Sequence, residues 1–176
     1  MVAGVSYNDH LNLRAAPGAT QPIIGTIPPT EMDLEAVGET RILTGTYWTK
    51  VIHDGKTGWV HMGYVGYAGS VDDMTSVVVD SLHEYPTAPT MRELGLIIAA
   101  VFVSDDPDAS SRVVRVTAGT GGDIGEIIYD VIGFADDSLG GLRLHIFAQK
   151  VSDGYSFKAV EVMSICLRGV SSGSCV

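Results

Sequence analysis

Short apolar runs alternate with turn-forming residues over the first 68 residues, which is the pattern of a small β protein. The apolar runs lie at residues 11–14, 23–27, 32–37, 48–53 and 57–61. The last two runs flank Asp54-Gly55, a dipeptide that adopts the positive φ values of a tight two-residue turn. A turn is also expected at Gly38-Glu39. Strands this short and this closely spaced predict a small β-barrel.

The pattern changes after residue 75. Three consecutive valines at residues 77–79 predict a short strand. Thr90 and Glu93 then have the spacing of a capping box, in which both side chains satisfy free groups at a helix start. Apolar residues follow at helical spacing, at Met91, Leu94, Ile97, Ile98 and Val101. We therefore expect one amphipathic helix that ends before Asp105-Asp106-Pro107.

Four β-runs complete the chain, at residues 112–117, 126–134, 142–150 and 155–167. In the third run Leu142, Leu144, Ile146 and Ala148 alternate with Arg143, His145, Phe147 and Gln149, which predicts a sheet with one buried face. Glycine-containing turns between the runs predict an antiparallel meander, and a loss of phase near Val160-Glu161 predicts a β-bulge. One helix packed on this meander gives an α+β domain.

Two domains are expected from these patterns. Residues 1–68 form the barrel, residues 69–75 are small and acidic enough to act as a linker, and residues 76–176 form the α+β domain. The expected fold class is mainly β. The sequence of residues 76–176 resembles no family, and it predicts neither a role nor an oligomeric state.

The charge distribution is uneven and acidic. The formal net charge of the chain is −10; residues 1–68 carry four Lys/Arg against six Asp/Glu, and residues 69–176 carry seven against fifteen. Nucleic-acid binding is not expected, because it requires a basic face that neutralises phosphates. The longest apolar run, residues 94–103, is half the length of a bilayer helix, so no membrane span is expected.

Cys166 and Cys175 are the only cysteines, and turn-forming residues separate them. A disulfide between them would stabilise the fold by roughly 2–3 kcal/mol through restriction of the unfolded chain. The alternative is two free thiols in a cytosolic protein. The small polar loop favours the disulfide, and with it an exported protein. Because the first ten residues lack a signal-peptide pattern, we expect that a signal has been removed before Met1.

Several motifs identify the N-terminal half more closely. They are LNLRAAPG at residues 11–18, IIGTIPP at 23–29, YWTKV at 47–51 and GKTGWVHMGYV at 55–65. In this order and spacing, residues 5–67 resemble the bacterial SH3 domain family. Residues 41–46 are longer than the usual turn of that family. The resemblance implies an SH3-like barrel of a type commonly found on exported bacterial proteins, where it binds cell-wall peptides or glycans.

Five residues of the barrel are candidates for ligand binding, namely Tyr47, Trp48, Trp59, Tyr64 and Arg14. Aromatic faces exposed near loops can stack on sugars or peptides. Trp59 lies within a strand and is expected more in the core than at a ligand. His53 and His61 flank the predicted turn and could face each other, but two histidines alone make a weak metal site, so no metal and no cofactor are expected.

The expected function is therefore that of an exported, non-enzymatic binding protein. Its barrel would attach to peptidoglycan or another envelope peptide or glycan, and its second domain would recognise a protein partner or mediate assembly. The alternative is a small cell-wall hydrolase, with His145, Asp130 and His83 in one pocket, or an inhibitor-type regulator of such hydrolases.

Other short motifs do not support an enzyme. Residues 169–173 match a nucleophile elbow but have no histidine after them, and residues 119–125 have the wrong spacing for a dinucleotide loop. A loose ion site at residues 105–108 is a weak alternative.

Overall fold

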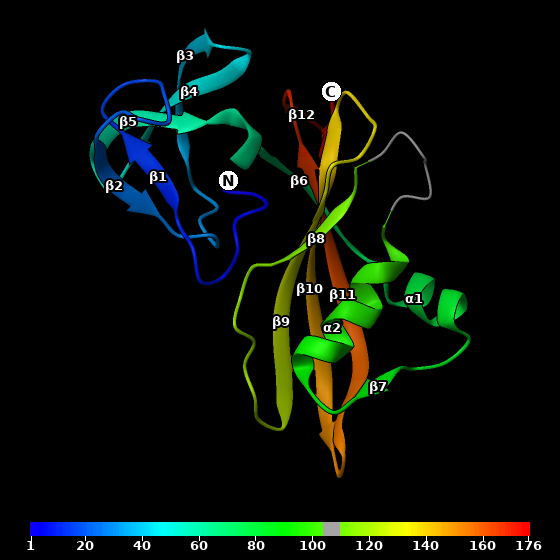
Figure 1. Cartoon of the computed structure of the whole chain (residues 1–176). Coiled ribbons are helices and arrows are strands. Elements are labelled where there is room, and N and C mark those ends of the chain that lie inside the picture. The colour runs from blue at the N-terminus through cyan, green and yellow to red at the C-terminus, as the bar shows by residue number, and fades with distance from the viewer. Residues whose placement is uncertain (104–109) are drawn as a thin grey trace.

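The computed structural model describes residues 1–103 and 110–176, which form an N-terminal barrel and a larger sheet that carries two helices on one face (Figure 1). The fold is mainly β with antiparallel sheets, as predicted. The helix predicted from Met91 ends at Val101, before Asp105-Asp106-Pro107 as expected. The weak ion site at residues 105–108 lies outside the described residues.

Five strands form the barrel sheet, in the order β2-β1-β5-β4-β3. They are β1 (Leu11–Arg14), β2 (Ile23–Ile27), β3 (Glu35–Leu43), β4 (Thr46–His53) and β5 (Lys56–His61). A 3₁₀ turn, η1 (Met62–Tyr64), follows β5. The hairpin predicted around Asp54-Gly55 is confirmed, because β4 and β5 are paired and these two residues have φ values of 49° and 71°.

Strand β3 is longer than predicted. A turn was expected at Gly38-Glu39, but the strand continues through it with a shift of register between Ala36 and Thr40. Gly38 adopts a φ of 79°, which suits a bulge that bends the strand without ending it. A second two-residue turn at Thr44-Gly45 then joins β3 to β4. The long segment at residues 41–46 is therefore the extended tip of a β-hairpin.

A second sheet has the order β6-β11-β10-β9-β8, and its strands are all antiparallel. These strands are β6 (Tyr67–Asp73), β8 (Arg112–Arg115), β9 (Ile124–Ile132), β10 (Leu139–Val151) and β11 (Gly154–Cys166). The predicted meander is present in β8 to β11. The bulge in β11 lies at Lys158, slightly before its predicted position, since Phe157 and Ala159 pair with the adjacent residues Ala148 and Phe147.

The predicted linker at residues 69–75 is wrong, because most of it belongs to β6, which pairs with β11. The small residues of this segment allow it to pack closely against β11, and they do not make it a flexible linker. A Cβ atom on Gly69 would lie only 2.9 Å from Ser164 Cβ and 3.2 Å from Cys166 Sγ. The barrel and the second sheet are therefore joined by a strand that is itself part of the sheet.

Two helices, not one, cover the sheet. The valines predicted as a strand at residues 77–79 belong to α1 (Thr75–Leu82). The Asp73 carboxylate accepts the Thr75 N–H at 2.9 Å, and Val78 is fully buried while its neighbour Val77 is 40% exposed, as on an amphipathic helix. In the second helix, α2 (Met91–Val101), the predicted capping box is confirmed. Glu93 N–H donates to Thr90 Oγ1 at 3.2 Å, and that hydroxyl donates to the Glu93 carboxylate.

Both helices pack on the face of the sheet that carries Leu144, Ile146 and Ala148. The opposite face was predicted to be solvent-exposed, but Arg143 on that face is only 6% exposed. The reason is that the barrel and the N-terminal residues cover this part of the sheet. A short strand, β7 (Thr87–Ala88), pairs with β11 beside the helices.

A buried ion pair joins the two halves. Arg143 donates two hydrogen bonds to Asp130, with Nε–Oδ1 and Nη2–Oδ2 distances of 2.8 and 2.9 Å. The same guanidinium donates to the Val2 and Pro29 carbonyl oxygens, and Asp130 accepts the Gly4 N–H at 2.8 Å. Because the partners come from the N-terminal residues (Val2 and Gly4), the barrel (Pro29) and the sheet (Asp130), this cluster fixes these three parts relative to one another.

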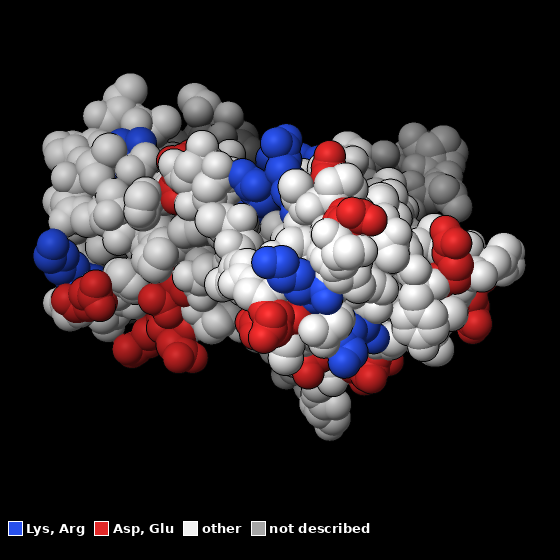
Figure 2. Space-filling view, turned by 90° about the horizontal axis from the view of Figure 1, so that it is seen from below, with Lys and Arg blue, Asp and Glu red and all other residues white. Residues whose placement is uncertain are grey.

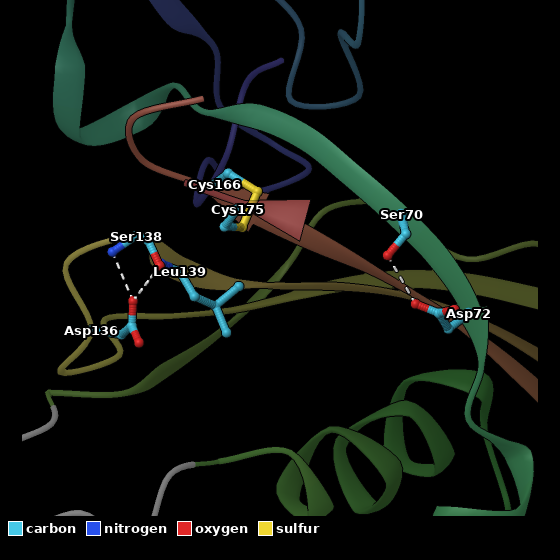
Figure 3. The surroundings of a disulfide bond; sticks show 7 residues. All are labelled: Ser70, Asp72, Asp136, Ser138, Leu139, Cys166 and Cys175. Carbon is cyan, nitrogen blue, oxygen red and sulfur yellow. Dashed lines mark hydrogen bonds between the residues drawn. A yellow bond between two sulfur atoms is a disulfide. The ribbon is translucent and has the colours of Figure 1, made fainter. Parts of the chain in front are cut away.

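The disulfide predicted between Cys166 and Cys175 is present, with a Cα–Cα distance of 5.1 Å (Figure 3). It ties the end of β11 to a small hairpin made of β12 (Val170–Ser171) and β13 (Ser174–Cys175). Ser70 N–H donates to the Gly173 carbonyl oxygen, so this hairpin also contacts β6. No helix in the described part of the chain is long and apolar enough to cross a membrane.

Candidate functional site

The candidate site is a cleft of about 430 Å³ between the barrel and the edge strand β8. One side comes from β1, β4, β5 and η1 of the barrel, and the other comes from β8. The N-terminal segment lies between them. The residues that define the cleft are Asp9, His10, Arg14, Trp48, His61, Tyr64, Arg112 and Val114.

Three aromatic rings form a continuous wall of the cleft. Trp48 and His61 are paired residues of β4 and β5, and their ring centroids are 5.6 Å apart in an edge-to-face arrangement. The His61 and Tyr64 centroids are 5.4 Å apart. Gly63 N–H donates to His61 Nδ1 at 2.9 Å, which assigns the remaining ring proton to Nε2 in the neutral imidazole. Hairpin pairing and the 3₁₀ turn thus place the rings in a row.

Charged groups lie around this aromatic wall. The Arg14 guanidinium donates to the Gln21 carbonyl oxygen at 2.7 Å, which orients it from β1. Arg112 reaches the cleft from β8 and packs on Gly4, where an added Cβ would lie 3.5 Å from Arg112 Nη2. Asp9 is exposed at the rim and accepts the His10 N–H. The cleft therefore offers two cations and one anion beside an apolar surface.

The structure brings together only three of the five predicted ligand-binding residues. Arg14, Trp48 and Tyr64 line the cleft, whereas Tyr47 and Trp59 do not. Trp48 is 5% exposed and Tyr64 is 37% exposed, so the phenol ring of Tyr64 is the accessible one of the two.

The other two predicted residues lie elsewhere on the barrel. Tyr47 is 55% exposed in the β3–β4 hairpin and pairs with Ile42. Trp59 is 7% exposed, with Arg41 and Lys50 at 5.9 and 5.8 Å from its ring centre. These two cations cover the face of the Trp59 indole.

The other five residues that define the cleft were not predicted as ligand-binding residues, namely Asp9, His10, His61, Arg112 and Val114. The sequence suggests His61 only as a partner for His53, and the two do not face each other, since His61 pairs with Trp48 and His53 with Lys56. His53 instead contacts Glu31, with an Nε2–Oε2 distance of 3.0 Å. Hydrogen bonds from the Asp33 N–H and then from His53 lower the pKa of the Glu31 carboxyl.

The residues considered for a hydrolase do not gather in one pocket. Asp130 is fully buried and bonded to Arg143 and Gly4. His145 contacts Glu126 at 3.3 Å and Phe147, and His83 ends α1 on the opposite face of the sheet. Within residues 1–103 and 110–176, no group of three or more His, Cys, Asp or Glu side chains could hold a metal ion.

The surface charge is mixed. On the face shown in Figure 2, Lys and Arg side chains lie among Asp and Glu side chains and do not form one continuous basic surface. The face in Figure 2 is therefore not a basic surface of the kind that binds nucleic acid.

Comparison with known proteins gives one match. Residues 9–66, about a third of the chain, match the family model described as "Bacterial SH3 domain". No curated protein and no solved structure matches the chain. Such a domain and a disulfide are both compatible with an extracytoplasmic protein. Residues 9–66 are thus a bacterial SH3 domain, which carries the aromatic wall of the cleft, and it is joined to a second domain that matches no family model.

Proposed function

We propose that the protein binds a cell-wall peptide or glycan in the cleft between its SH3 domain and β8. The observation that carries this proposal is the convergence of Arg14, Trp48 and Tyr64, all chosen from sequence, on a single concave site. The match of residues 9–66 to the bacterial SH3 domain family supports a wall component as the ligand.

The chemistry of the cleft suits such a ligand. A cavity of about 430 Å³ is the size of a small-molecule or short-peptide site. Trp48, which lines the cleft, and the exposed ring of Tyr64 provide an apolar surface on which a sugar or a peptide segment can stack. Arg14 and Asp9 can then form hydrogen bonds with polar groups of the sugar or the peptide. These hydrogen bonds would fix the orientation of the bound ligand.

The same proposal places the protein outside the cytoplasm, in the periplasm or at the cell envelope. A disulfide persists in an oxidising compartment, and the wall lies there. In this arrangement the barrel tethers the chain, and the second domain recognises another protein or mediates assembly.

Sedimentation with purified peptidoglycan tests the proposal. Tyr64→Ala should weaken binding, because it removes the accessible ring of the aromatic wall, and Tyr47→Ala is the matched control, since Tyr47 is an exposed tyrosine of the same barrel outside the cleft. Contacts of an aromatic ring are worth about 1 kcal/mol, so the loss should be roughly fivefold in affinity. Equal binding by the two variants and the wild type would contradict the proposal.

A further inference from the structure

The second domain supplies part of the cleft. Arg112 and Val114 of β8 line it, and they pair with Ile132 and Asp130 of β9. Residues directly opposite each other in an antiparallel pair project to the same face of a sheet. Arg112 and Val114 therefore lie on the face that carries the buried Asp130, which is the face toward the barrel.

Two sets of contacts hold β8 in this position. The ion pair of Asp130 and Arg143 fixes the sheet against the barrel and the N-terminal residues. In addition, Tyr7 N–H donates to the Arg115 carbonyl oxygen at 2.9 Å, and the Arg115 guanidinium stacks on the Tyr7 ring at 3.8 Å from its centre. The wall that β8 contributes is thus fixed in place before a ligand arrives.

The charges in the cleft differ from those of the whole chain. The protein has a net charge of −10, yet two arginines, Arg14 and Arg112, enter this one cleft from opposite domains. Among the described residues neither of them forms a salt bridge. Guanidinium groups bind carboxylates by charge-assisted, often bidentate hydrogen bonds. A ligand with a free carboxylate fits this pair better than a neutral glycan does.

We propose that Arg112 is a ligand-binding residue and that the ligand is a cell-wall peptide with a free carboxylate, bound between the SH3 domain and β8. This proposal rests on the proposed function and makes it more specific, because it selects the peptide over the glycan and makes both domains necessary for binding. Asp9, at the rim, provides a counter-charge for an amine of the same peptide.

Sedimentation with two forms of purified peptidoglycan tests this inference in the full chain. One form is native, and in the other the carboxyl groups are converted to amides with carbodiimide and ammonia. Arg112→Ala should bind native peptidoglycan about tenfold more weakly than the wild type, as expected for one lost charge-assisted interaction. Lys158→Ala is the control, since it removes one exposed cation of the second domain outside the cleft.

Amidation should weaken binding of the wild type more than that of Arg112→Ala, which already lacks the interaction. Binding of the wild type to amidated peptidoglycan tests the role of the ligand carboxylate without any substitution. This result therefore does not depend on whether Arg112→Ala folds stably. Equal binding by Arg112→Ala and Lys158→Ala, together with weakened binding by Tyr64→Ala, would overturn the role of β8 and leave the proposed function intact. Wild-type affinity by all three variants would overturn both proposals.

Discussion

The barrel and the second domain differ in how they bury apolar side chains. Among the described residues of the second domain, fifteen buried side chains from α1, α2, β7, β9, β10 and β11 form one core. The barrel core has seven, and two of these, Val2 and Val5, precede the residues that match the family model. A core this small supplies little stability on its own.

The small core implies that the barrel obtains part of its stability from residues outside the SH3 domain. Val2 and Val5 complete its core, and the ion pair of Asp130 and Arg143 anchors it to the sheet. Trp48, His61 and Tyr64 can then line the cleft instead of joining this core. The second domain accordingly acts as a support for the SH3 domain as well as one wall of its site.

The largest predicted effect comes from the buried ion pair. Asp130→Ala should lower the free energy of unfolding by about 3–5 kcal/mol, because it leaves Arg143 buried without its counter-charge. Asp137→Ala is the control, since it breaks the exposed pair of Asp137 and Arg168 and should cost about 1 kcal/mol or less. Urea denaturation measures both values. Similar losses in the two variants would show that the junction does not stabilise the barrel.

A smaller effect is expected from the disulfide. Reduction, or the Cys166→Ala/Cys175→Ala double substitution, should lower the free energy of unfolding by roughly 2–3 kcal/mol through the entropy of the short loop that it closes. Local opening should increase most at the edge of the second sheet, where β12 and β13 contact β6. Hydrogen exchange can locate it. Loss of protection in β1 or β5, with β6 unchanged, would be evidence against this assignment.

The smallest effect concerns pH. Hydrogen bonds from the Leu139 and Ser138 N–H groups lower the pKa of Asp136 in the second domain, just as the Asp33 N–H and His53 lower that of Glu31 in the barrel. A lowered folded-state pKa contributes stability above the ordinary value near 4, and this contribution is lost as the pH falls through the folded value.

The urea midpoint of the wild type should fall between about pH 5 and pH 2, as these two carboxylates become protonated. In Asp136→Asn and in Glu31→Gln one of the two carboxylates is absent, so the midpoint of each variant should fall less than that of the wild type. A pH dependence identical to that of the wild type in both variants would argue against these hydrogen bonds in solution.

Local patterns were enough to predict much of the fold. The Asp54-Gly55 hairpin, the capping box at Thr90, the meander and the disulfide each depend on residues close together in the sequence. The predictions were wrong where tertiary contacts, and not the local sequence, determine the secondary structure. Residues 77–79 have high β propensity, but burial of Val78 against the sheet and the Asp73 bond to Thr75 favour a helix.

The site was predicted less completely than the fold. Arg14, Trp48 and Tyr64 could be chosen because they lie in recognisable barrel motifs. Arg112 could not, because its place in the cleft depends on contacts between residues more than one hundred positions apart, such as Gly4 with Asp130 and Val2 with Arg143. From the sequence Asp130 is a candidate only as a catalytic acid, because no local signal indicates that it is the buried partner of Arg143.

The two tryptophans allow the most direct test of where the ligand binds. Trp48 lines the cleft, and Trp59 lies outside it beneath Arg41 and Lys50. Titration of ¹⁵N-labelled protein with soluble peptidoglycan peptides should shift the indole N–H resonance of Trp48 and leave that of Trp59 in place, with assignments from Trp→Phe variants. A shift of Trp59 with an unmoved Trp48 would contradict binding in the cleft.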